Sequence, residues 1–472
     1  MPLLDLAFLL IDRPETPSNV GVLMLFDPPP GRSAASAAGQ IVRAYRAARP
    51  GPPFDAVPDI SVLALPHWRP ALRVDMRQHV LRERLPAPGD LETLCRHVAQ
   101  LHEAPLNRSR PLFSVHVVDG LASGQLAVYL KSHHASWDGR YALERIYGQM
   151  SREPGPVTAP FFAWPAEQAR AAEPGNPAMG LAAGLRSLVT QAAAARELFG
   201  KLSARSRAAP TAPNPQGNRP FAGPHTRFND PVAPGRSFAC FRLPLGEMRR
   251  VARACGGTLN DVALAVVDGG VERLLASLGE RPRQPLVAMC PVSLREPGDH
   301  EATTKAATLF VPLARPRSGA LDRLRQIVAN TRAAKAEFND FSHEAALDYA
   351  LLAFGLWFAS SKLGLGAITR PVINLTVSNV GAVDGARYLG SCRLAAAYPV
   401  SMIADPTGLN VTVLSVGDHM DFGIVANAAV LADAFELAGA CEAWFTQLQR
   451  AARRPVAGGA PRPPRPRPRV ST

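Results

Sequence analysis

The sequence Ser132-His133-His134-Ala135-Ser136-Trp137-Asp138-Gly139 joins two segments of different pattern. The run 125–131 before it is rich in β-forming residues, and a helical pattern of apolar residues begins near Tyr141 after it. The two histidines are therefore predicted to lie on a turn between a strand and a helix, where an imidazole can meet a substrate. Because the pKa of histidine is near neutrality, a histidine at this position is suited to act as a general base.

The segments that precede this turn also follow a regular pattern. Asp90 can cap a helix whose apolar residues recur at helical spacing as far as Leu101. Two β-rich runs follow, 112–118 and 125–131, and the glycine-containing segment 119–124 between them predicts a hairpin. We therefore expect a helix, a hairpin, the histidine turn and a second helix in succession.

The histidine pair has an alternative interpretation as surface or metal-binding residues beside an aspartate that caps a helix. Adjacent side chains on a strand point to opposite faces, however, so the two imidazoles would chelate one ion poorly. No carboxylate or thiol stands at the spacing that would complete a metal site, and we predict no bound metal. The six cysteines are far apart and form no C-x-x-C pair, so reduced core thiols are expected.

Motifs of several other enzyme classes are absent from the sequence. It contains no G-x-S-x-G elbow, no Walker-type loop and no G-x-G-x-x-G, which argues against a serine hydrolase, a nucleotide triphosphatase and a dinucleotide oxidoreductase. A histidine base without a neighbouring nucleophile suits a reaction in which the hydroxyl of the substrate attacks an activated acyl donor such as a thioester.

The length and composition predict a globular protein that is divided near its middle. The 472 residues are 47% hydrophobic and 19% charged, an ordinary balance for folded proteins. A Pro- and Ala-rich segment over 154–219, with an apolar helical pattern inside it, indicates a crossover linker. We therefore predict an N-terminal lobe over 1–153, a C-terminal lobe over 220–452 and a disordered Pro/Arg-rich tail over 453–472.

The net charge of +13 does not by itself indicate nucleic-acid binding. The tail holds six arginines and no acid, and no DNA- or RNA-binding pattern accompanies it, so no nucleic-acid partner is predicted.

The N-terminus lacks the basic region that opens a secretory signal, which indicates a cytoplasmic protein. The apolar stretch 349–361 is shorter than the ~20 residues that span a bilayer, and it is either a buried helix or a helix that contacts a lipid surface.

Further segments on both sides of the histidine turn resemble one enzyme family. They are Leu4-Asp-Leu-Ala-Phe-Leu-Leu10, Asn19-Val-Gly21, Pro105–Phe113, Leu259-Asn-Asp-Val262, Pro291-Val-Ser-Leu-Arg295, Phe310–Leu313, Val377-Ser-Asn-Val380, Leu409–Ser415 and Asp421–Ala426. Together with H-H-x-x-x-D-G they make the chain, from Leu3 to Leu448, similar to the bacterial wax ester synthase/diacylglycerol acyltransferase family. This family is one branch of the coenzyme A-dependent acyltransferases that share the histidine motif.

The resemblance implies a fold and a set of site residues. The fold would be α/β and two-lobed, of the chloramphenicol acetyltransferase type, with a mixed sheet flanked by helices in each lobe and an active-site tunnel between the lobes. His134 would be the general base, supported by His133 and by Asp138 beside Gly139. Asp138 is better placed to hold the turn through a salt bridge than to relay protons, and Arg295 is its candidate partner.

The same resemblance implies an activity. Acyl-coenzyme A, as a substrate and with no separate cofactor, would donate its acyl group to diacylglycerol or to a long-chain alcohol. Asn260 would position this acceptor or stabilise the oxyanion, and a buried structural asparagine is the alternative. Two other functions stay open: an acyltransferase whose donor is bound to a carrier protein, and an inactive homologue that coats lipid inclusions. Any contact with the inner membrane or with inclusions would be peripheral.

Overall fold

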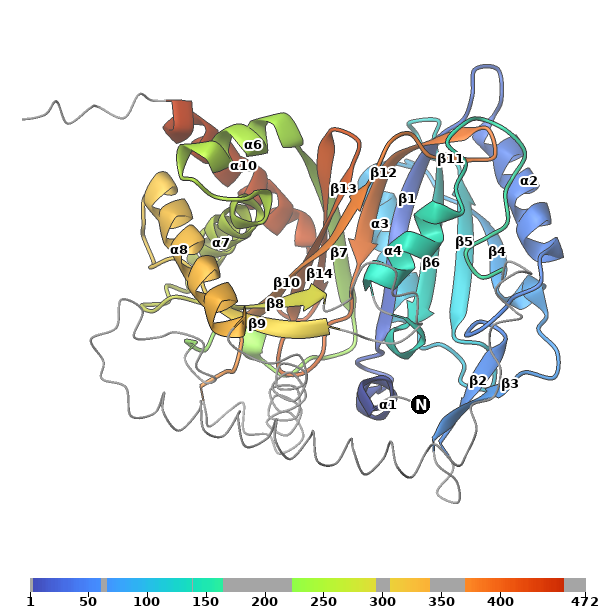
Figure 1. Ribbon diagram of the computed structural model, residues 1–472, viewed down its shortest axis with the longest axis horizontal. Coiled ribbons are helices and arrows are strands. Elements are labelled where there is room, and N and C mark those ends of the chain that lie inside the picture. Colours follow the sequence, from blue (N-terminus) through green and yellow to red (C-terminus); the bar gives the residue numbers. More distant parts are fainter. Residues whose placement is uncertain are drawn as a thin grey trace, which may run out of the picture.

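The computed structural model describes residues 3–60, 66–137, 139–163, 223–293, 306–339 and 370–453. These residues form two lobes that lie side by side, each built on one mixed β-sheet (Figure 1). The predicted two-lobed α/β architecture is confirmed. The apolar stretch 349–361, the tail after Arg453 and most of the predicted linker over 154–219 lie outside the described residues.

The first sheet has six strands in the order β11-β12-β1-β6-β5-β4. Its neighbours are antiparallel except for β4 and β5, which are parallel. The strands are β1 (Asn19–Asp27), β4 (Val80–Arg84), β5 (Phe113–Asp119), β6 (Leu126–His133), β11 (Tyr388–Leu389) and β12 (Cys392–Val400). The second half of the chain therefore completes the sheet that the first half begins.

Local sequence explains the elements around the first sheet. Helix α3 (Leu91–Glu103) begins as predicted, because Asp90 Oδ1 accepts a hydrogen bond from Thr93 N at 2.8 Å. The predicted hairpin is the antiparallel pair β5 and β6, and Gly120 and Gly124 in its turn adopt φ values of 90° and 76°, which glycine reaches without strain. The remaining elements of this lobe are α1 (Leu3–Ile11), α2 (Ala34–Ala47), β2 (Ala56–Asp59), β3 (His67–Pro70), η1 (Met76–Gln78), η2 (His134–Ser136) and α4 (Gly139–Gly148).

The second sheet also has six strands, in the order β7-β14-β13-β10-β8-β9. Helices α6, α7, α8 and α10 pack against this sheet in one hydrophobic core, and α7 is buried along most of its length. The elements of this lobe are η3 (Arg227–Asn229), β7 (Arg236–Pro244), α6 (Leu245–Ala254), α7 (Leu259–Ser277), β8 (Val287–Ser293), β9 (Ala306–Pro312), α8 (Ala320–Asn339), β10 (Leu375–Val383), β13 (Leu409–Val416), β14 (His419–Asn427) and α10 (Ala434–Arg453).

The two lobes meet where β12 of the first sheet faces β14 of the second. Gly423 lies so close to the carbonyl of Pro399 that a Cβ atom would not fit there. Asp421 Oδ2 accepts a hydrogen bond from Ala397 N at 2.8 Å, which ties the two strands together. Among the described helices, none is both long and apolar enough to cross a bilayer.

Candidate active site

The backbone of the histidine turn is fixed by two neighbouring segments. Strand β6 ends at His133, and η2 leads from His134 towards α4, so the predicted turn between strand and helix is confirmed. The amide of His133 donates to the carbonyl of Leu112 at 3.0 Å, and the amide of His134 donates to the carbonyl of Ser18 at 2.8 Å. The two histidines are therefore held against the start of β5 and the start of β1.

His133 is buried and has a defined tautomer. Its Nδ1 accepts a hydrogen bond from Ala135 N at 3.1 Å, so the proton of the neutral ring is on Nε2. This Nε2 faces Asp12 Oδ2 at 3.6 Å, a distance that allows electrostatic attraction but is too long for a hydrogen bond. His133 is thus oriented by the backbone on one side and by a carboxylate on the other.

Asp12 lies between α1 and β1 and connects several parts of the turn. Its Oδ1 accepts a hydrogen bond from Ser18 N at 2.6 Å, and its Oδ2 accepts one from Arg108 Nη2 at 3.0 Å. Burial alone would raise the pKa of Asp12, but the nearby His133 and the hydrogen bonds from Ser18 and Arg108 lower it. Asp12 is therefore ionised at neutral pH and places a negative charge beside His133.

His134 is half-buried, and its ring stacks on Phe8 of α1. The two ring centroids are 3.9 Å apart and the ring planes differ by 19°. Phe8 belongs to a small apolar cluster with Leu9, Leu112 and Ala135, which packs α1 against the turn. Helix α1 therefore fixes the plane of the His134 imidazole, since the stacked geometry restricts rotation of the ring.

A cavity of about 180 Å³ opens beside His134 between the two lobes. The first sheet and α4 supply one wall, and β8, β10 and β13 of the second lobe supply the other. Most of the lining is apolar, with a few hydroxyl groups. The lining residues are Val20, Gly21, Val22, Leu130, Ser132, His134, Trp137, Gly139, Ala142, Leu143, Ile146, Tyr147, Pro291, Ser378, Val380, Pro399, Ser401, Thr412 and Leu414. Such a cavity suits a long apolar chain whose reacting end lies at the histidine.

The titratable side chains in this described lining are His134 and Tyr147. Burial raises the pKa of Tyr147 far above its ordinary value, so this phenol stays neutral. The hydroxyl groups of Ser401 and Thr412 are 2.9 Å apart and bond to each other. His134 is therefore the lining group that can exchange a proton near neutral pH.

Gly139 is the first residue of α4, and its lack of a side chain lets this helix pack closely against the second lobe. A Cβ atom at this position would come within 3.0 Å of Val380 Cγ1 of the second lobe. Glycine therefore allows α4 to approach β10 closely, and both residues line the cavity.

The other predicted site residues either do not line the cavity at His134 or lie outside the described residues. Asp138 and Arg295 lie outside the described residues, and so does their predicted salt bridge. Asn260 is half-buried in the first turn of α7, next to the Thr258 cap, and is not among the residues that line the cavity. Its role as a site residue stays a prediction. Sequence reasoning missed Phe8 and Asp12, although the first of these lies in a segment that carries the family resemblance.

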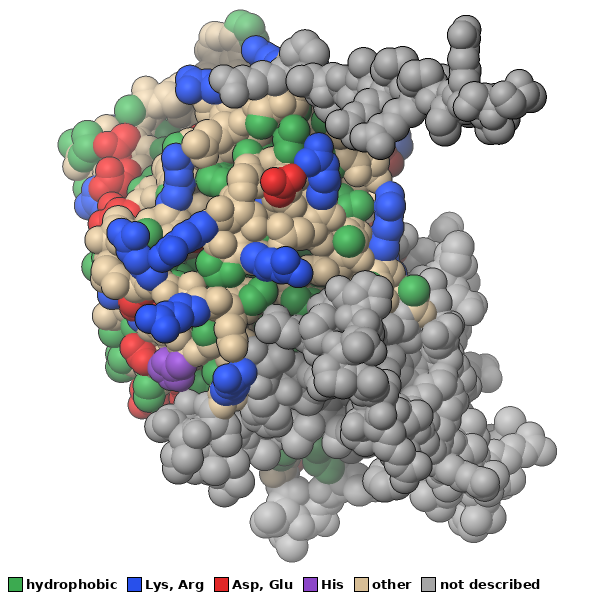
Figure 2. All heavy atoms as spheres, turned by 90° about the vertical axis from the view of Figure 1, so that its left-hand side faces the viewer, with side chains coloured by type: hydrophobic (Ala, Val, Ile, Leu, Met, Phe, Trp, Pro, Cys, Tyr) green, Lys and Arg blue, Asp and Glu red, His purple; other side chains and the backbone are tan. Residues whose placement is uncertain are grey.

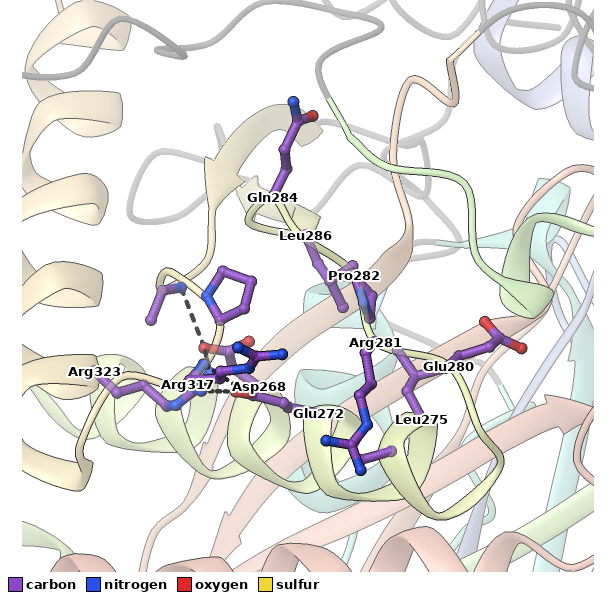
Figure 3. Close-up of a pocket in the computed structure, with 13 residues that line it drawn as sticks. Asp268, Glu272, Leu275, Glu280, Arg281, Pro282, Gln284, Leu286, Arg317 and Arg323 are labelled. Carbon is purple, nitrogen blue, oxygen red and sulfur yellow. Dashed lines mark hydrogen bonds and ion pairs between the residues drawn. The ribbon is translucent and has the colours of Figure 1, made fainter.

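A second cavity, of about 90 Å³, lies within the second lobe beyond α7 (Figure 3). Arg323 reaches from α8 towards Asp268, and the two side chains form an ion pair at 2.5 Å. Asp268 and Glu272 in its lining both pair with Arg323, so these charged groups link α7 to α8. Over the described ranges, no three His, Cys, Asp or Glu side chains come together in a way that could hold a metal ion.

Two family models match the chain. The wax ester synthase/diacylglycerol acyltransferase catalytic domain matches residues 1–263, and the WS/DGAT C-terminal domain matches residues 304–449. A relative from Mycobacterium tuberculosis, named "Putative diacyglycerol O-acyltransferase", is 30% identical over 89% of this chain and 91% of its own. A relative of the same name from Mycobacterium bovis is 31% identical over 95% of this chain and 98% of its own.

Solved structures agree in fold with the described lobes. The wax ester synthase/diacylglycerol acyltransferase from Marinobacter aquaeolei VT8 aligns with a TM-score of 0.74 and 24% identity, covering 96% of this chain and 99% of that chain. The first condensation domain of the CDA synthetase aligns with a TM-score of 0.56 and 16% identity, covering 97% of this chain and 96% of that chain. Both similarities therefore place the two lobes in the same fold class.

Proposed function

The chain belongs to the wax ester synthase/diacylglycerol acyltransferase family, and from this premise we propose that His134 is its general base. It is an acyl-CoA-dependent acyltransferase that esterifies diacylglycerol, a long-chain alcohol, or both. The observation that carries the assignment of the base is the position of His134. This residue is the imidazole in the described lining of an apolar cavity between the lobes, and imidazole is the side chain best suited to act as a general base.

In the proposed reaction, His134 takes up one proton at the start and gives it up at the end. The neutral imidazole removes the proton from the hydroxyl group of the acceptor, and the acceptor oxygen then attacks the thioester carbonyl carbon. The C–O bond forms, the C–S bond breaks, and coenzyme A leaves as a thiolate that takes the proton from the imidazolium. Because thiols have a pKa near 8.5, the thiolate departs with little help from an acid. No separate cofactor is required in this scheme.

The two histidines have different roles in this proposal. His133 is buried, bonded to the backbone of the turn, and faces Asp12, so it holds the turn and does not meet substrate. His134 faces the cavity, and Phe8 fixes the plane of its ring. Asp138 would complete the support of the turn through Arg295. The alternatives, a carrier-bound donor and an inactive coat protein of lipid inclusions, are not favoured by the family membership.

Release of free thiol from palmitoyl-CoA tests this proposal. The wild-type protein is assayed with hexadecanol, with dioleoylglycerol and with no acceptor, beside His134→Ala. We expect thiol release that depends on the acceptor and falls by about 100- to 10,000-fold in the variant. His225→Ala, which changes an exposed histidine, is the matched control and should keep the wild-type rate. Equal thiol release by wild type and a folded His134→Ala variant would contradict the assignment.

We also propose that the protein meets its lipid acceptor from the cytoplasmic side, at the surface of the inner membrane or of a lipid inclusion. Figure 2 shows Lys and Arg side chains spread over the middle of one face of the second lobe, with Asp and Glu side chains mainly at its edge. Exposed arginines of α6 and α8 include Arg249, Arg253, Arg325 and Arg332. A basic face of this kind attracts anionic lipids. Sedimentation with phosphatidylglycerol vesicles but not with phosphatidylcholine vesicles, weakened by salt, is the expected result.

A further inference from the structure

A cleft of about 460 Å³ lies between the lobes at the far end of β1, β12 and β13 from the histidine turn. We call it the arginine cleft. Strands β11 and β12 form one side, and the turn between β13 and β14 forms the other (Figure 1). Its lining residues are Asp27, Arg242, Gly385, Ala386, Arg387, Arg393, Leu394, Ala395, Val416, Gly417, Asp418 and His419. Nothing in the proposed reaction at His134 uses this cleft.

Two of the arginines that line the arginine cleft have no ion-pair partner among the described residues. Arg387 and Arg393 line it, and neither forms an ion pair within the part of the chain that the structure describes. Arg152 is a third member, because its Nη1 would lie 3.6 Å from a Cβ atom placed on Gly385. The Nε of Arg387 is buried and has no hydrogen-bond partner. A buried guanidinium donor without an acceptor is uncommon in a folded protein.

The electrostatics of Arg387 agree with this geometry. Burial lowers the pKa of Arg387 first, and the charge of Arg152 lowers it further, while Asp384 acts in the opposite direction. Two guanidinium groups are therefore held close enough to repel each other. Folding does not require such an arrangement, but a bound anion would relieve both the repulsion and the missing hydrogen bond.

Two acids, Asp27 and Asp418, also line the arginine cleft. Asp27 Oδ1 accepts a hydrogen bond from Gln125 Nε2 at 2.8 Å. Asp418 bonds to His419 Nδ1 at 2.6 Å, and 92% of its side chain is exposed. Neither carboxylate forms an ion pair with an arginine of the cleft. Arg387 and Arg393 therefore have no ion-pair partner among the described acids that line the cleft.

Arg242, in contrast, is already neutralised. Its Nε lies 3.0 Å from Asp421 Oδ1. Its Nη2 donates to the carbonyl of Ala395 at 3.2 Å. Arg242 therefore belongs to the junction of the lobes, and the charge that is left for a ligand comes from Arg152, Arg387 and Arg393.

The arginine cleft and the cavity at His134 are lined by different parts of two shared strands. Along β13, Leu414 lines the cavity and Val416 lines the cleft. Along β12, Pro399 lines the cavity and Ala395 lines the cleft. Along β1, Asn19 pairs with His133 and Asp27 lines the cleft, so the histidine turn and the cleft are roughly 26 Å apart at a rise of about 3.3 Å per residue. A ligand with its reacting end at His134 and an anionic end some distance away would suit both sites.

We propose that the arginine cleft binds the phosphate groups of the acyl-CoA donor, with Arg387 and Arg393 as the principal contacts and Arg152 beside them. This inference rests on the proposed acyl transfer, because coenzyme A carries its thioester at one end and its phosphates at the other. Guanidinium groups bind phosphate oxygens through paired hydrogen bonds, which the free donors of these arginines can supply. The cleft is then a binding subsite, and none of its arginines touches the reacting atoms.

Titration with adenosine 3′,5′-bisphosphate tests the cleft without any turnover. We expect the full-length wild-type protein to bind this probe, and Arg387→Gln and Arg393→Gln each to weaken its Kd about tenfold, the order expected for losing a charge-assisted hydrogen bond. Arg49→Gln, which changes an exposed arginine of the first lobe, is the matched control and should bind as wild type does. Absence of binding by the wild-type protein, or equal binding by all variants, would overturn the proposal.

A kinetic comparison then tests whether the bound phosphate belongs to the donor. The preference of the wild-type enzyme for palmitoyl-CoA over the palmitoyl thioester of N-acetylcysteamine, which has no phosphate, should fall about tenfold in Arg387→Gln. An unchanged preference, with bisphosphate binding lost, would overturn the donor assignment. A second outcome would also overturn the donor assignment. In it, the wild-type protein does not bind the bisphosphate but binds phosphatidylglycerol vesicles, and the same variants lose this vesicle binding. If wild type transfers from neither thioester but binds the bisphosphate through the arginines, the proposed function fails while the anion site stands.

Discussion

Each lobe buries a basic side chain beside a carboxylate, and the two clusters differ in how tightly they are closed. In the second lobe, Arg323 Nη1 lies 2.5 Å from Asp268 Oδ2, and the same guanidinium also pairs with Glu272. In the first lobe, His133 Nε2 lies 3.6 Å from Asp12, which is outside hydrogen-bond range. We call the pair at hydrogen-bond distance closed and the longer pair open. The closed pair has a structural role. The open pair orients the His133 imidazole, and the charge of Asp12 can still respond when a group nearby is protonated.

The tight cluster joins three helices of the second lobe. Arg323 comes from α8, Asp268 and Glu272 come from α7, and the Arg323 guanidinium lies 5.1 Å from the ring centre of Trp444 on α10. Asp268 also accepts a hydrogen bond from Ala314 N at 3.1 Å. Both members of the central pair are almost completely buried, with 1% and 3% of their side chains exposed. This cluster is therefore expected to contribute to stability and not to catalysis.

Breaking the tight pair should have the largest effect. Asp268→Ala leaves the Arg323 charge buried without its closest partner, and we expect a loss of about 3–5 kcal/mol in the free energy of unfolding. Urea titration followed by circular dichroism measures this loss. Asp322→Asn, which breaks an exposed pair with Arg325, should change it by less than about 0.5 kcal/mol. A change below about 1 kcal/mol for Asp268→Ala would show that the closed pair does not hold the lobe.

The pair between Asp421 and Arg242 should show an intermediate effect that depends on pH. Burial raises the pKa of Asp421 to about 6, against the opposing charge of Arg242. Between pH 4 and pH 6 the folded protein then holds a proton that the unfolded chain has released, so the free energy of unfolding falls as the pH rises through this window. The pKa difference corresponds to an upper bound of about 3 kcal/mol.

The test of this pair compares the pH dependence of stability in two proteins. Asp421→Asn keeps an oxygen that can accept the hydrogen bond from Ala397 N but cannot titrate. Its free energy of unfolding, measured by urea titration from pH 4 to pH 7, should therefore lack the decline seen in the wild-type protein. Parallel curves for the two proteins would mean that Asp421 is ionised throughout and forms a closed pair like that of Asp268.

Local patterns in the sequence were sufficient to predict the helix, hairpin and turn that carry the histidines. They were not sufficient to predict which distant segments pack around them. The Asp90 cap, the glycines of the hairpin and the His133–His134 turn depend on neighbours within a few residues, so the pattern along the chain predicts them. Strand β12 joins the first sheet across a long separation in sequence, and its alternation of residues indicates a buried strand but not its partner. Pairing of distant strands follows from total burial, which no local pattern records.

The same limit applies to the residues that touch the histidines. Phe8 and Asp12 reach the turn because α1 and the start of β1 fold back on β6. The helical pattern of α1 shows that one face is apolar, and it does not show that this face meets an imidazole. The arginine cleft is hidden in the sequence for a related reason, since Arg152, Arg387 and Arg393 are brought together only by the crossing of β11 and β12 into the first lobe.

The open cluster of the first lobe should affect rate more than stability. Asp12→Asn removes the charge that faces His133 while keeping an oxygen that can accept from Ser18 or Arg108. We expect kcat to fall about tenfold, equivalent to about 1.4 kcal/mol of barrier, with little change in KM. Because a nearby negative charge favours imidazolium, the rise of kcat/KM with pH, which reports His134, should move to lower pH.

Two measurements separate this role from a structural one. Asp59→Asn, which breaks a half-exposed pair with Arg69 in the same lobe, should leave kcat and its pH profile as they are in the wild-type protein. If Asp12→Asn instead costs as much unfolding free energy as Asp268→Ala, with an unmoved pH profile, the two clusters are alike and the distinction between open and closed pairs is wrong.

The smallest effect is expected from the stacked ring of Phe8. Phe8→Leu keeps an apolar side chain against His134 but removes the flat surface, and a stacked contact contributes about 0.5–1 kcal/mol, so kcat should fall roughly two- to fivefold. Phe8→Tyr should restore most of this loss because it restores the ring, and Leu10→Ala, which truncates an exposed residue of the same helix, should have no effect. Equal losses for Phe8→Leu and Phe8→Tyr would mean that α1 supports the turn through its bulk alone, and the orientation of the imidazole would then depend on the backbone bond from His134 to Ser18.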